Sequence, residues 1–445
     1  MNTRNTLKIN SLGHIEIGGV DVLELKAKYG TPLYVLDIDY ILDIISVFSK
    51  TIRDEYGCGR VSYASKALST KAIYELLKNT DAGCDVVSGG ELYTALSVGF
   101  PCDRLELHGN NKLPNEVQMA IENNVNTIVL DGFDDIKLVA EIAEENNKVV
   151  NVLLRLNPGI SAHTHEFVQT AQEDSKFGLS ISNGSAIKAI GEILQNKWLH
   201  LNGIHTHIGS QIFEYEAFVS AAKIMTDFIL TIKNTFGFEI DELNMGGGFG
   251  IYYEGDDKVF TLETYANHLK ALITAVKSEL IGKGLKKPFL TVEPGRAIVG
   301  EAGITLYTVG GIKDIPNIRK YVAVDGGLFD NPRYALYGSR YSAVIADRAN
   351  EIQDDFVTVC GKCCESGDLI AKDINLQKAK VGDTLCVFST GAYNYSMASN
   401  YNRNLVPPMV AVRKGQSAYI VKPQTYEDIV RNDVVPDIIK CSDQT

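Results

Sequence analysis

Lys66 is the first residue whose type and position could do chemistry. It follows a segment in which Val61, Tyr63 and Ala64 favour a buried strand. A lysine is rarely buried without a partner, so its ammonium group reaches water, pairs with a carboxylate or serves as a reactive amine. For a lysine considered alone, a solvated or ion-paired side chain is the more common outcome. Other residues of the chain favour the reactive amine.

Three consecutive glycines, in the motif MGGGFG from Met245 to Gly250, could bind phosphate. Without a Cβ atom the backbone can approach an anion closely, and exposed amide groups can form an anion-binding nest. The alternative is a plain turn, since the spacing matches neither the dinucleotide motif nor the P-loop. Because the glycines follow the seventh predicted strand of a barrel, where phosphate sites are common, we favour phosphate binding.

The motif EPGR places a carboxylate, Glu293, three residues before Arg296. The two could form a salt bridge at the rim, but they also suit a ring nitrogen and an anionic group. Pyridoxal phosphate needs a lysine that forms a Schiff base, a site for its phosphate and a partner for its ring nitrogen. Lys66, the three glycines and the EPGR motif together could supply these three features. His207 could stack on a flat ring, although a satisfied core histidine is its ordinary interpretation.

A metal site is the competing interpretation, since two His-x-His pairs begin at His163 and His205. No further His or Asp follows the eighth predicted strand to complete a ligand set. The motif CGKC from Cys360 has no second cysteine pair. We therefore expect no metal.

Eight apolar strands separated by amphipathic helices must position these residues, which predicts a (β/α)8 barrel of the α/β class over residues 37–300. The strands are residues 61–65, 83–88, 105–109, 127–131, 151–157, 201–209, 242–248 and 289–295. Their carboxyl ends should share one cleft. The residues found there are Lys66, Ser88, His108, Asp131, Arg155, Asn157, His207, Gly246–Gly248 and Glu293.

The remaining residues predict a second, β-rich domain. After residue 300 the helical period fades, and short strands with glycine turns follow. The first 36 residues also read as strands around one short helix, so we expect them to pair with this domain. Residues 1–36 and 301–445 would then form a discontinuous β-rich domain.

Composition excludes several classes of protein. The chain has 445 residues, of which 45% are hydrophobic and 22% charged, and a net charge of −12, which argues against nucleic acid or an anionic membrane as the main partner. No apolar run has the length of a membrane span or a signal peptide, so we expect a cytoplasmic protein. The eight scattered cysteines should be thiols. Cys364, in a glycine loop beside acidic residues, would need an electropositive neighbour to be reactive.

Ordered motifs along nearly the whole chain resemble the fold-type III pyridoxal-phosphate-dependent decarboxylases, which share the alanine racemase barrel, and among these the members that act on diaminopimelate. The motifs are GTPLYV from Gly30, SYASKA from Ser62, DVVSGGEL from Asp85, RLNPG from Arg155, DSKFG from Asp174, HTHIGSQ from His205, GGGFG from Gly246, EPGR from Glu293, YALYG from Tyr334, CESGD from Cys364 and GAY from Gly391.

The resemblance implies a role for each of several residues. Lys66 would hold the cofactor as a Schiff base, His207 would cover one ring face, Glu293 would bind the pyridine nitrogen, and Cys364 would return a proton to the product. The implied cofactor-binding set is Lys66, Asp85, His207, Ser210, Gly247, Gly248, Glu293, Gly295, Arg296 and Tyr393. The implied substrate-binding set is Arg296, Arg333, Tyr337, Glu365 and Tyr393.

The resemblance also implies the reaction, which is decarboxylation of meso-2,6-diaminopimelate to L-lysine and carbon dioxide, the last step of lysine biosynthesis. Two arginines suit a substrate with two carboxylates, and Glu365 suits its distal ammonium. The family forms a homodimer in which the Cys364 loop enters the partner's barrel, and residues 161–176 are a candidate lid. The alternatives are decarboxylation of ornithine, arginine or lysine, a catalytically dead regulator, and a metal hydrolase.

Overall fold

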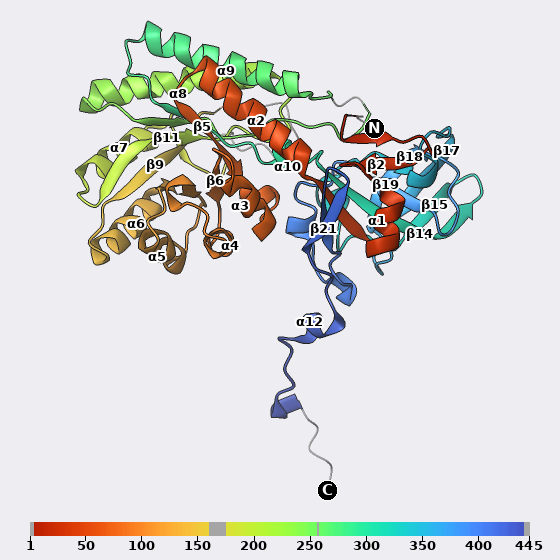
Figure 1. The fold of residues 1–445 in the computed structure, drawn as a ribbon. Helices are drawn as coiled ribbons and strands as arrows, with labels where there is room; N and C mark the ends of the chain where they lie inside the picture. Colours follow the sequence, from red (N-terminus) through yellow and green to blue (C-terminus); the bar gives the residue numbers. More distant parts are fainter. Residues whose placement is uncertain (1–3, 160–174, 256–257, 440–445) are drawn as a thin grey trace. The chain divides into compact units, whose positions relative to one another are not determined.

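The computed structural model describes residues 4–159, 175–255 and 258–439 (Figure 1). The pair His163 and His165, and all but the last two residues of the candidate lid, lie outside these ranges. The chain forms two compact units. Unit 1 comprises the segment that ends at Thr6, Asp37–Ile304 and Phe388–Ser396; unit 2 comprises Leu7–Leu36, Thr305–Val387 and the chain from Met397 onwards.

Unit 1 contains a closed barrel of eight parallel strands, which confirms the predicted fold class. Each strand pairs with the next along the chain, and the last pairs with the first to close the ring. The strands are β5 (Gly59–Ala64), β6 (Gly83–Val86), β7 (Leu105–Leu107), β8 (Thr127–Leu130), β9 (Val150–Asn157), β11 (Leu199–Thr206), β12 (Glu242–Asn244) and β13 (Phe289–Val292). A short strand, β10 (Leu179–Ser180), also pairs with β9.

Helices connect the barrel strands, and α8 and α9 pack side by side (Figure 1). They are α2 (Ile38–Glu55), α3 (Lys71–Lys78), α4 (Gly89–Ser97), α5 (Pro114–Glu122), α6 (Phe133–Glu145), α7 (Ser185–Gln195), α8 (Tyr215–Phe236), α9 (Leu262–Gly282) and α10 (Arg296–Val299), with single turns η1 (Ser65–Ala67) and η2 (Cys102–Arg104). Helix α2 shows why they form: Ile41, Ile44, Ile45, Phe48 and Ile52 make one buried apolar stripe at helical spacing.

Unit 2 is built on β-sheets, as predicted. Strands β1 (Leu7–Ile9), β2 (Ile15–Ile17) and β3 (Val20–Asp21) form a small antiparallel sheet. A nine-stranded sheet contains β4 (Leu33–Asp37), β14 (Gly303–Ile315), β15 (Arg319–Val324), β16 (Ala343–Ile345), β17 (Asp355–Cys360), β18 (Leu369–Leu376), β19 (Thr384–Val387), β20 (Met409–Arg413) and β21 (Gln416–Val421). Strand β4 lies between β14 and β20, so the N-terminal segment does join this sheet.

Short helices complete unit 2. They are α1 (Val22–Tyr29), α11 (Arg333–Tyr337), α12 (Tyr426–Val430) and the single turns η4 (Ala346–Arg348), η6 (Tyr401–Arg403) and η7 (Asp437–Ile439); a further turn, η5 (Tyr395–Met397), begins in unit 1. Helix α1 begins where Asp21 accepts a hydrogen bond from the backbone amide of Leu23.

Three segments that the sequence predicts in the β-rich domain group with unit 1 instead, namely the one ending at Thr6, residues 301–304 and residues 388–396. The backbone amide of Tyr393 donates to the carbonyl of Ala67 at 2.8 Å, and Arg4 donates to the carbonyl of Glu301, also at 2.8 Å. Such bonds join segments far apart in sequence, so strand periodicity cannot predict them.

In the described ranges, no helix combines the length and apolar character needed to cross a membrane. The seven cysteines in those ranges are free thiols, as the composition predicted.

Candidate active site

Lys66 lies in η1, directly after β5, and its side chain is exposed. It makes no hydrogen bond or ion pair with the other residues that the structure describes. The preceding residue fixes the turn, since Ser65 donates from Oγ to Glu91 at 2.8 Å. A lysine on a rigid strand end without a carboxylate partner is available as a reactive amine, which is the interpretation the sequence favoured.

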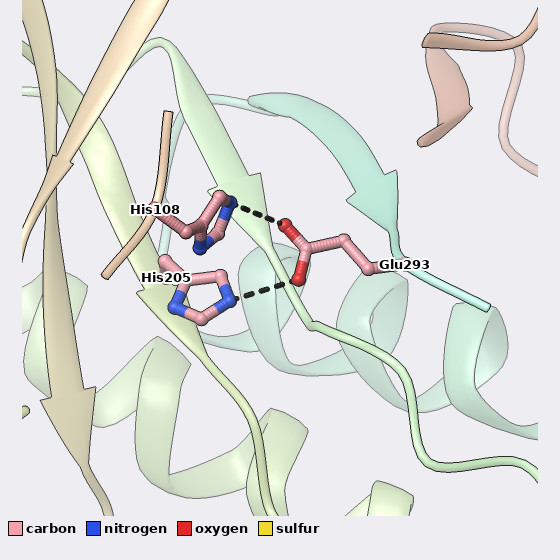
Figure 2. Close-up of side chains that lie close together, drawn as sticks. All are labelled: His108, His205 and Glu293. Carbon is pink, nitrogen blue, oxygen red and sulfur yellow. Dashed lines mark hydrogen bonds and ion pairs between the residues drawn. The ribbon is translucent and has the colours of Figure 1, made fainter. Parts of the chain in front are cut away.

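Glu293 follows β13 and is buried, and the side chains of His108 and His205 face its carboxylate (Figure 2). His108 Nε2 lies 3.1 Å from its Oε1 atom, and His205 Nε2 lies 3.1 Å from Oε2. The Asn244 amide donates to Oε1 at 2.7 Å. Both carboxylate oxygens therefore have polar partners from the barrel interior.

These contacts set the charge of the cluster. Burial alone raises the pKa of Glu293, but the charge of His108 and the ring N–H groups of both histidines lower it well below its usual value. Burial alone lowers the pKa of His108, but the carboxylates of Asp85 and Glu293 raise it to about 10. Burial lowers the pKa of His205 to about 4. At neutral pH the cluster holds an ionised Glu293, a cationic His108 and a neutral His205.

The sequence found no His or Asp after the eighth strand to complete a metal site, and the carboxylate at that place is Glu293. With His108 and His205 it brings three potential ligand atoms within 4.8 Å of one another. The nitrogen–oxygen distances of 3.1 Å from His108 and His205 to Glu293 are those of hydrogen bonds and ion pairs between the side chains themselves. Ion pairing and hydrogen bonding thus account for the cluster.

Asp85, on β6, is a buried carboxyl group whose Oδ1 atom has no hydrogen-bond partner among the described residues. Burial raises the pKa of Asp85 to about 7, although the positive charge of His108 acts in the opposite direction. A buried carboxyl oxygen without a partner is costly to leave unpaired, so it marks a place where a ligand can donate a hydrogen bond.

The glycine loop after β12 is packed too closely for any side chain. A Cβ atom added to Gly246 or Gly247 would collide with the carbonyl of Thr206 or Glu293. At Gly248, where φ is +108°, it would lie 2.5 Å from the carbonyl oxygen of Gly209. The backbone itself is thus the surface that this loop offers, which suits an anion such as phosphate.

Arg296 adds a positive charge near this loop. It is buried, and its guanidinium donates to Ser210 Oγ at 3.0 Å and to the hydroxyl of Tyr253. Its Cζ atom lies 4.9 Å from the ring centre of Tyr393, within range of a cation–π interaction. Tyr393 has a φ of +68°, which is unusual for a bulky residue. Gly295 lies directly before Arg296, and an added Cβ atom there would meet the carbonyl of Ala64.

His207 is half-buried just beyond β11. Its Nδ1 atom accepts a hydrogen bond from the backbone amide of Gly247 at 3.2 Å. Burial, together with the positive charges of Lys66 and Arg155, lowers the pKa of His207 well below its usual value. A neutral imidazole with a fixed ring plane is suited to stacking on a flat, electron-poor ring.

Three other strand-end residues have structural partners. Ser88 caps α4 by accepting from the amide of Glu91, and Asp131 pairs with Arg155 at 3.7 Å. Asn157 accepts from the backbone amide of Gly159 at 3.0 Å. Their place at the strand ends is confirmed, and these partners explain the residue types.

The other predicted site residues belong to unit 2. Arg333 and Tyr337 lie on α11, where the Arg333 Cζ atom is 5.1 Å from the ring centre of Tyr337. Cys364 and Glu365 are exposed in the loop between β17 and β18. The predicted cofactor residues therefore lie in unit 1, and the predicted substrate residues, apart from Arg296 and Tyr393, lie in unit 2.

Asp368 anchors the Cys364 loop, a role that no residue pattern predicts. Its carboxylate accepts from the backbone amides of Leu328 at 2.5 Å and Cys363 at 2.6 Å. The amide of Cys364 donates to Asn402 at 2.9 Å. The loop is thus held on both sides while the Cys364 thiol stays exposed.

The part of the Glu293 cluster made by His205 and Asn244 does not follow from the motifs of the sequence. A signal was available for His205, because residues two apart on a strand share a face and His207 was already placed at the cleft. Asn244 gave no comparable signal, since a single amide on an apolar strand has many uses.

The family model for the pyridoxal-binding domain of the pyridoxal-dependent decarboxylases matches residues 43–300, which is most of unit 1. The chain belongs to this family of enzymes. It is a pyridoxal-phosphate-dependent amino-acid decarboxylase with a cofactor-binding barrel.

Its relatives define the branch more narrowly. Diaminopimelate decarboxylase of Bacillus subtilis is 46% identical over 429 residues, which cover 96% of this chain and 97% of that one. The enzyme of the same name from Staphylococcus aureus is 45% identical over 429 residues, covering 96% and 99%. A crystal structure of diaminopimelate decarboxylase from M. jannaschii with L-lysine is 35% identical, has a TM-score of 0.89 and covers 98% and 99%. Within the family, the chain therefore groups with the diaminopimelate decarboxylases.

The residues of unit 1 fit pyridoxal phosphate. The glycine loop leaves no room for side chains, Arg296 supplies a cation, Asp85 offers an unpartnered oxygen, and Glu293 is an ionised carboxylate. When bound, the cofactor supplies a protonated ring that withdraws the electron pair left by a departing carboxyl group.

Proposed function

We propose that this protein decarboxylates meso-2,6-diaminopimelate to L-lysine and carbon dioxide, the last step of lysine biosynthesis. The observation that carries the proposal is the full-length similarity, at 46% identity over 96% of the chain, to a diaminopimelate decarboxylase. The substrate loses one carboxyl group as carbon dioxide, the bonding electron pair stays on carbon, and one proton replaces the carboxyl group.

Unit 1 would hold the cofactor. Lys66 would bind it covalently through its amine, and Gly247, Gly248, Ser210 and Arg296 would surround its phosphate. The close packing of the glycines and the contact of Arg296 with Ser210 support this assignment.

The rest of the cofactor would lie between side chains of the same unit. His207 would cover one face of the ring, and Glu293 would accept a hydrogen bond from the ring nitrogen. Asp85, Gly295 and Tyr393 would complete the cofactor site. The neutral state of His207 and the ionised state of Glu293 support these two roles.

Substrate recognition would depend on two arginines, two tyrosines and a glutamate. Arg296 and Arg333 would each hold a carboxylate, Glu365 would hold the distal ammonium, and Tyr337 and Tyr393 would contact the carbon chain or its polar ends. Cys364 would donate the proton that replaces the carboxyl group. Its exposure on a firmly anchored loop supports a role in contact with substrate.

The protein would work as a cytoplasmic homodimer. The Cys364 loop of one copy would serve the barrel of the other, as the resemblance to the family implies. A loop held rigid on its own unit and exposed at its tip is suited to such an exchange.

The competing function is decarboxylation of ornithine, arginine or lysine by the same chemistry. The exposed Glu365, which suits a second charged amino group, and the second arginine, Arg333, favour diaminopimelate. A catalytically inactive regulator is disfavoured, because Lys66 and Cys364 are both present.

The test is turnover by purified full-length protein with added pyridoxal phosphate. Carbon dioxide release is measured with meso-diaminopimelate, ornithine, arginine and lysine, each at the same concentration. We expect release from diaminopimelate at least about tenfold faster than from the others, with L-lysine as product. Faster release from ornithine, arginine or lysine would contradict the proposal.

A further inference from the structure

Each oxygen of Glu293 has a histidine of its own. His108, just beyond β7, lies at Oε1, and His205, on β11, lies at Oε2, each at 3.1 Å (Figure 2). The two rings are nearly perpendicular, with centres 5.0 Å apart. All three side chains are buried. A carboxylate with one imidazole on each oxygen cannot rotate without losing both contacts.

We propose that His108 and His205 are positioning residues that hold the Glu293 carboxylate ionised and oriented toward the cofactor ring, with His108 as a cation at neutral pH and His205 as a neutral donor. The inference deepens the proposed function and rests on Glu293 being the partner of the ring nitrogen. The two histidines have different roles, since His108 supplies a positive charge and His205 supplies a hydrogen-bond donor.

The hydrogen bonds of His205 indicate its neutral form. Its Nε2 atom faces Glu293 Oε2, and its Nδ1 atom is buried without a partner in the described chain. A neutral ring with the proton on Nε2 leaves a lone pair at Nδ1, whereas a cationic ring would leave a buried N–H group unpaired. An unpaired buried N–H is the costlier of the two.

The surroundings of His108 favour the opposite state. The charged groups around the cluster come from nearly every strand, and those nearest His108 are carboxylates. These are Asp85 on β6, Glu106 on β7 with an oxygen 3.9 Å from Nε2, and Glu293 after β13; farther out are Arg60, Lys66, Arg155, Glu242 and the neutral His207. Arg60 is already paired with Glu106 at 3.3 Å. His108 is thus the cation that balances Asp85 and Glu293.

The same contacts select one oxygen of Glu293 for the ring. Oε1 accepts from the Asn244 amide at 2.7 Å and lies 3.1 Å from His108 Nε2 in an ion pair without hydrogen-bond geometry, whereas among the described residues Oε2 has His205 as its one partner. A carboxylate oxygen has about two lone-pair sites, so Oε2 retains one for a further donor. Asn244 is fixed in turn, because its Oδ1 atom accepts from the backbone amide of Gly246 at 2.9 Å.

The first test is nuclear magnetic resonance of full-length protein labelled in its histidines, recorded before and after pyridoxal phosphate is added. At pH 8 we expect one cationic imidazole, and its signal should be absent from His108→Gln. A second imidazole should stay neutral, with its proton on Nε2, down to about pH 5, and its signal should be absent from His205→Gln. No cationic imidazole at pH 8 in the wild-type spectrum would overturn the inference even if a variant fails to fold.

The second test compares variants that keep or remove the positive charge of His108 and the hydrogen-bond donor of His205. His108→Gln keeps a donor but loses the charge, so kcat/KM should fall about 10- to 100-fold, and the acid limb of the pH profile should move to higher pH. His205→Gln keeps a neutral donor and should stay within about threefold, whereas His205→Leu should lose about tenfold. The control is His200→Gln, an exposed position at the start of β11, which should match wild type.

The outcomes separate this inference from the proposed function. An unshifted pH profile in His108→Gln, or equal losses in His205→Gln and His205→Leu, would show a merely structural role and overturn it. The protonation states of His108 and His205 are measured without any substrate. A protein that shows the expected states but decarboxylates no diamino acid would contradict the proposed function and leave the assigned states standing.

Discussion

Cys364 is exposed, whereas its neighbour Cys363 is half-buried. Substitution of Cys363 is therefore a matched control for substitution of Cys364. If Cys364 supplies the proton that replaces the carboxyl group, Cys364→Ser should lower kcat about 100-fold or more, because a hydroxyl is a far weaker acid than a thiol. Cys363→Ser should stay within about threefold, since a hydroxyl can keep the contacts of this thiol with Asn404 and with the Asp368 carboxylate. Steady-state kinetics with diaminopimelate measures both. Equal losses in the two variants would contradict the role of Cys364.

His108 should also make stability depend on pH. Its pKa is raised to about 10 in the folded protein by the carboxylates around it, from about 6.5 in the unfolded chain. Because the pKa of His108 is higher in the folded protein, protonated His108 contributes its full stabilisation of the fold below pH 6.5. This contribution is lost as the pH rises from 6.5 to about 10. The free energy of unfolding of wild type should therefore fall over that interval relative to His108→Gln. Urea unfolding at several pH values measures it; parallel curves would contradict the cationic state.

The glycine loop after β12 is an element whose backbone must lie close to its neighbours. In Gly248→Ala a Cβ atom would lie 2.5 Å from the carbonyl of Gly209, in a backbone conformation that alanine rarely adopts. We expect the dissociation constant for pyridoxal phosphate to rise about tenfold or more. The control, Gly282→Ala at the end of α9, adds a Cβ with no atom within 4 Å and should bind normally. Fluorescence titration of both variants measures this dissociation constant. Normal affinity in Gly248→Ala would contradict the assignment of the glycine loop to the cofactor phosphate.

At the scale of helices and strands, the sequence predicts those elements whose apolar residues recur with a regular period. All eight barrel strands follow from apolar segments separated by helices, because parallel strands are buried on both faces. Strands β18 and β20 have no clear pattern, because Lys372 and Asp373 interrupt the apolar residues of β18 at an irregular register and Pro407 and Pro408 precede β20. The Glu293 cluster could be predicted only in part, since it needs the lateral register of β7, β11 and β13.

At the scale of the whole molecule, a homodimer with exchanged loops predicts complementation. Lys66→Ala and Cys364→Ser should each be nearly inactive alone. Mixed subunits of the two variants would contain one intact site per heterodimer, so activity should return to about one quarter of wild type after random exchange. Activity is measured after mixing under mild dissociating conditions. A control that mixes Lys66→Ala with Lys66→Ala should stay inactive, and no recovery in the mixed sample would contradict shared sites.

The central claim is that the amine of Lys66 holds the cofactor at the carboxyl end of β5. Borohydride treatment of the protein with pyridoxal phosphate makes a lysine–cofactor bond permanent, and peptide mass mapping then locates it. We expect the added mass on the peptide that contains Lys66, and none on the peptide that contains Lys71, the next lysine in the chain. Added mass on another lysine, with Lys66 unmodified, would contradict the account.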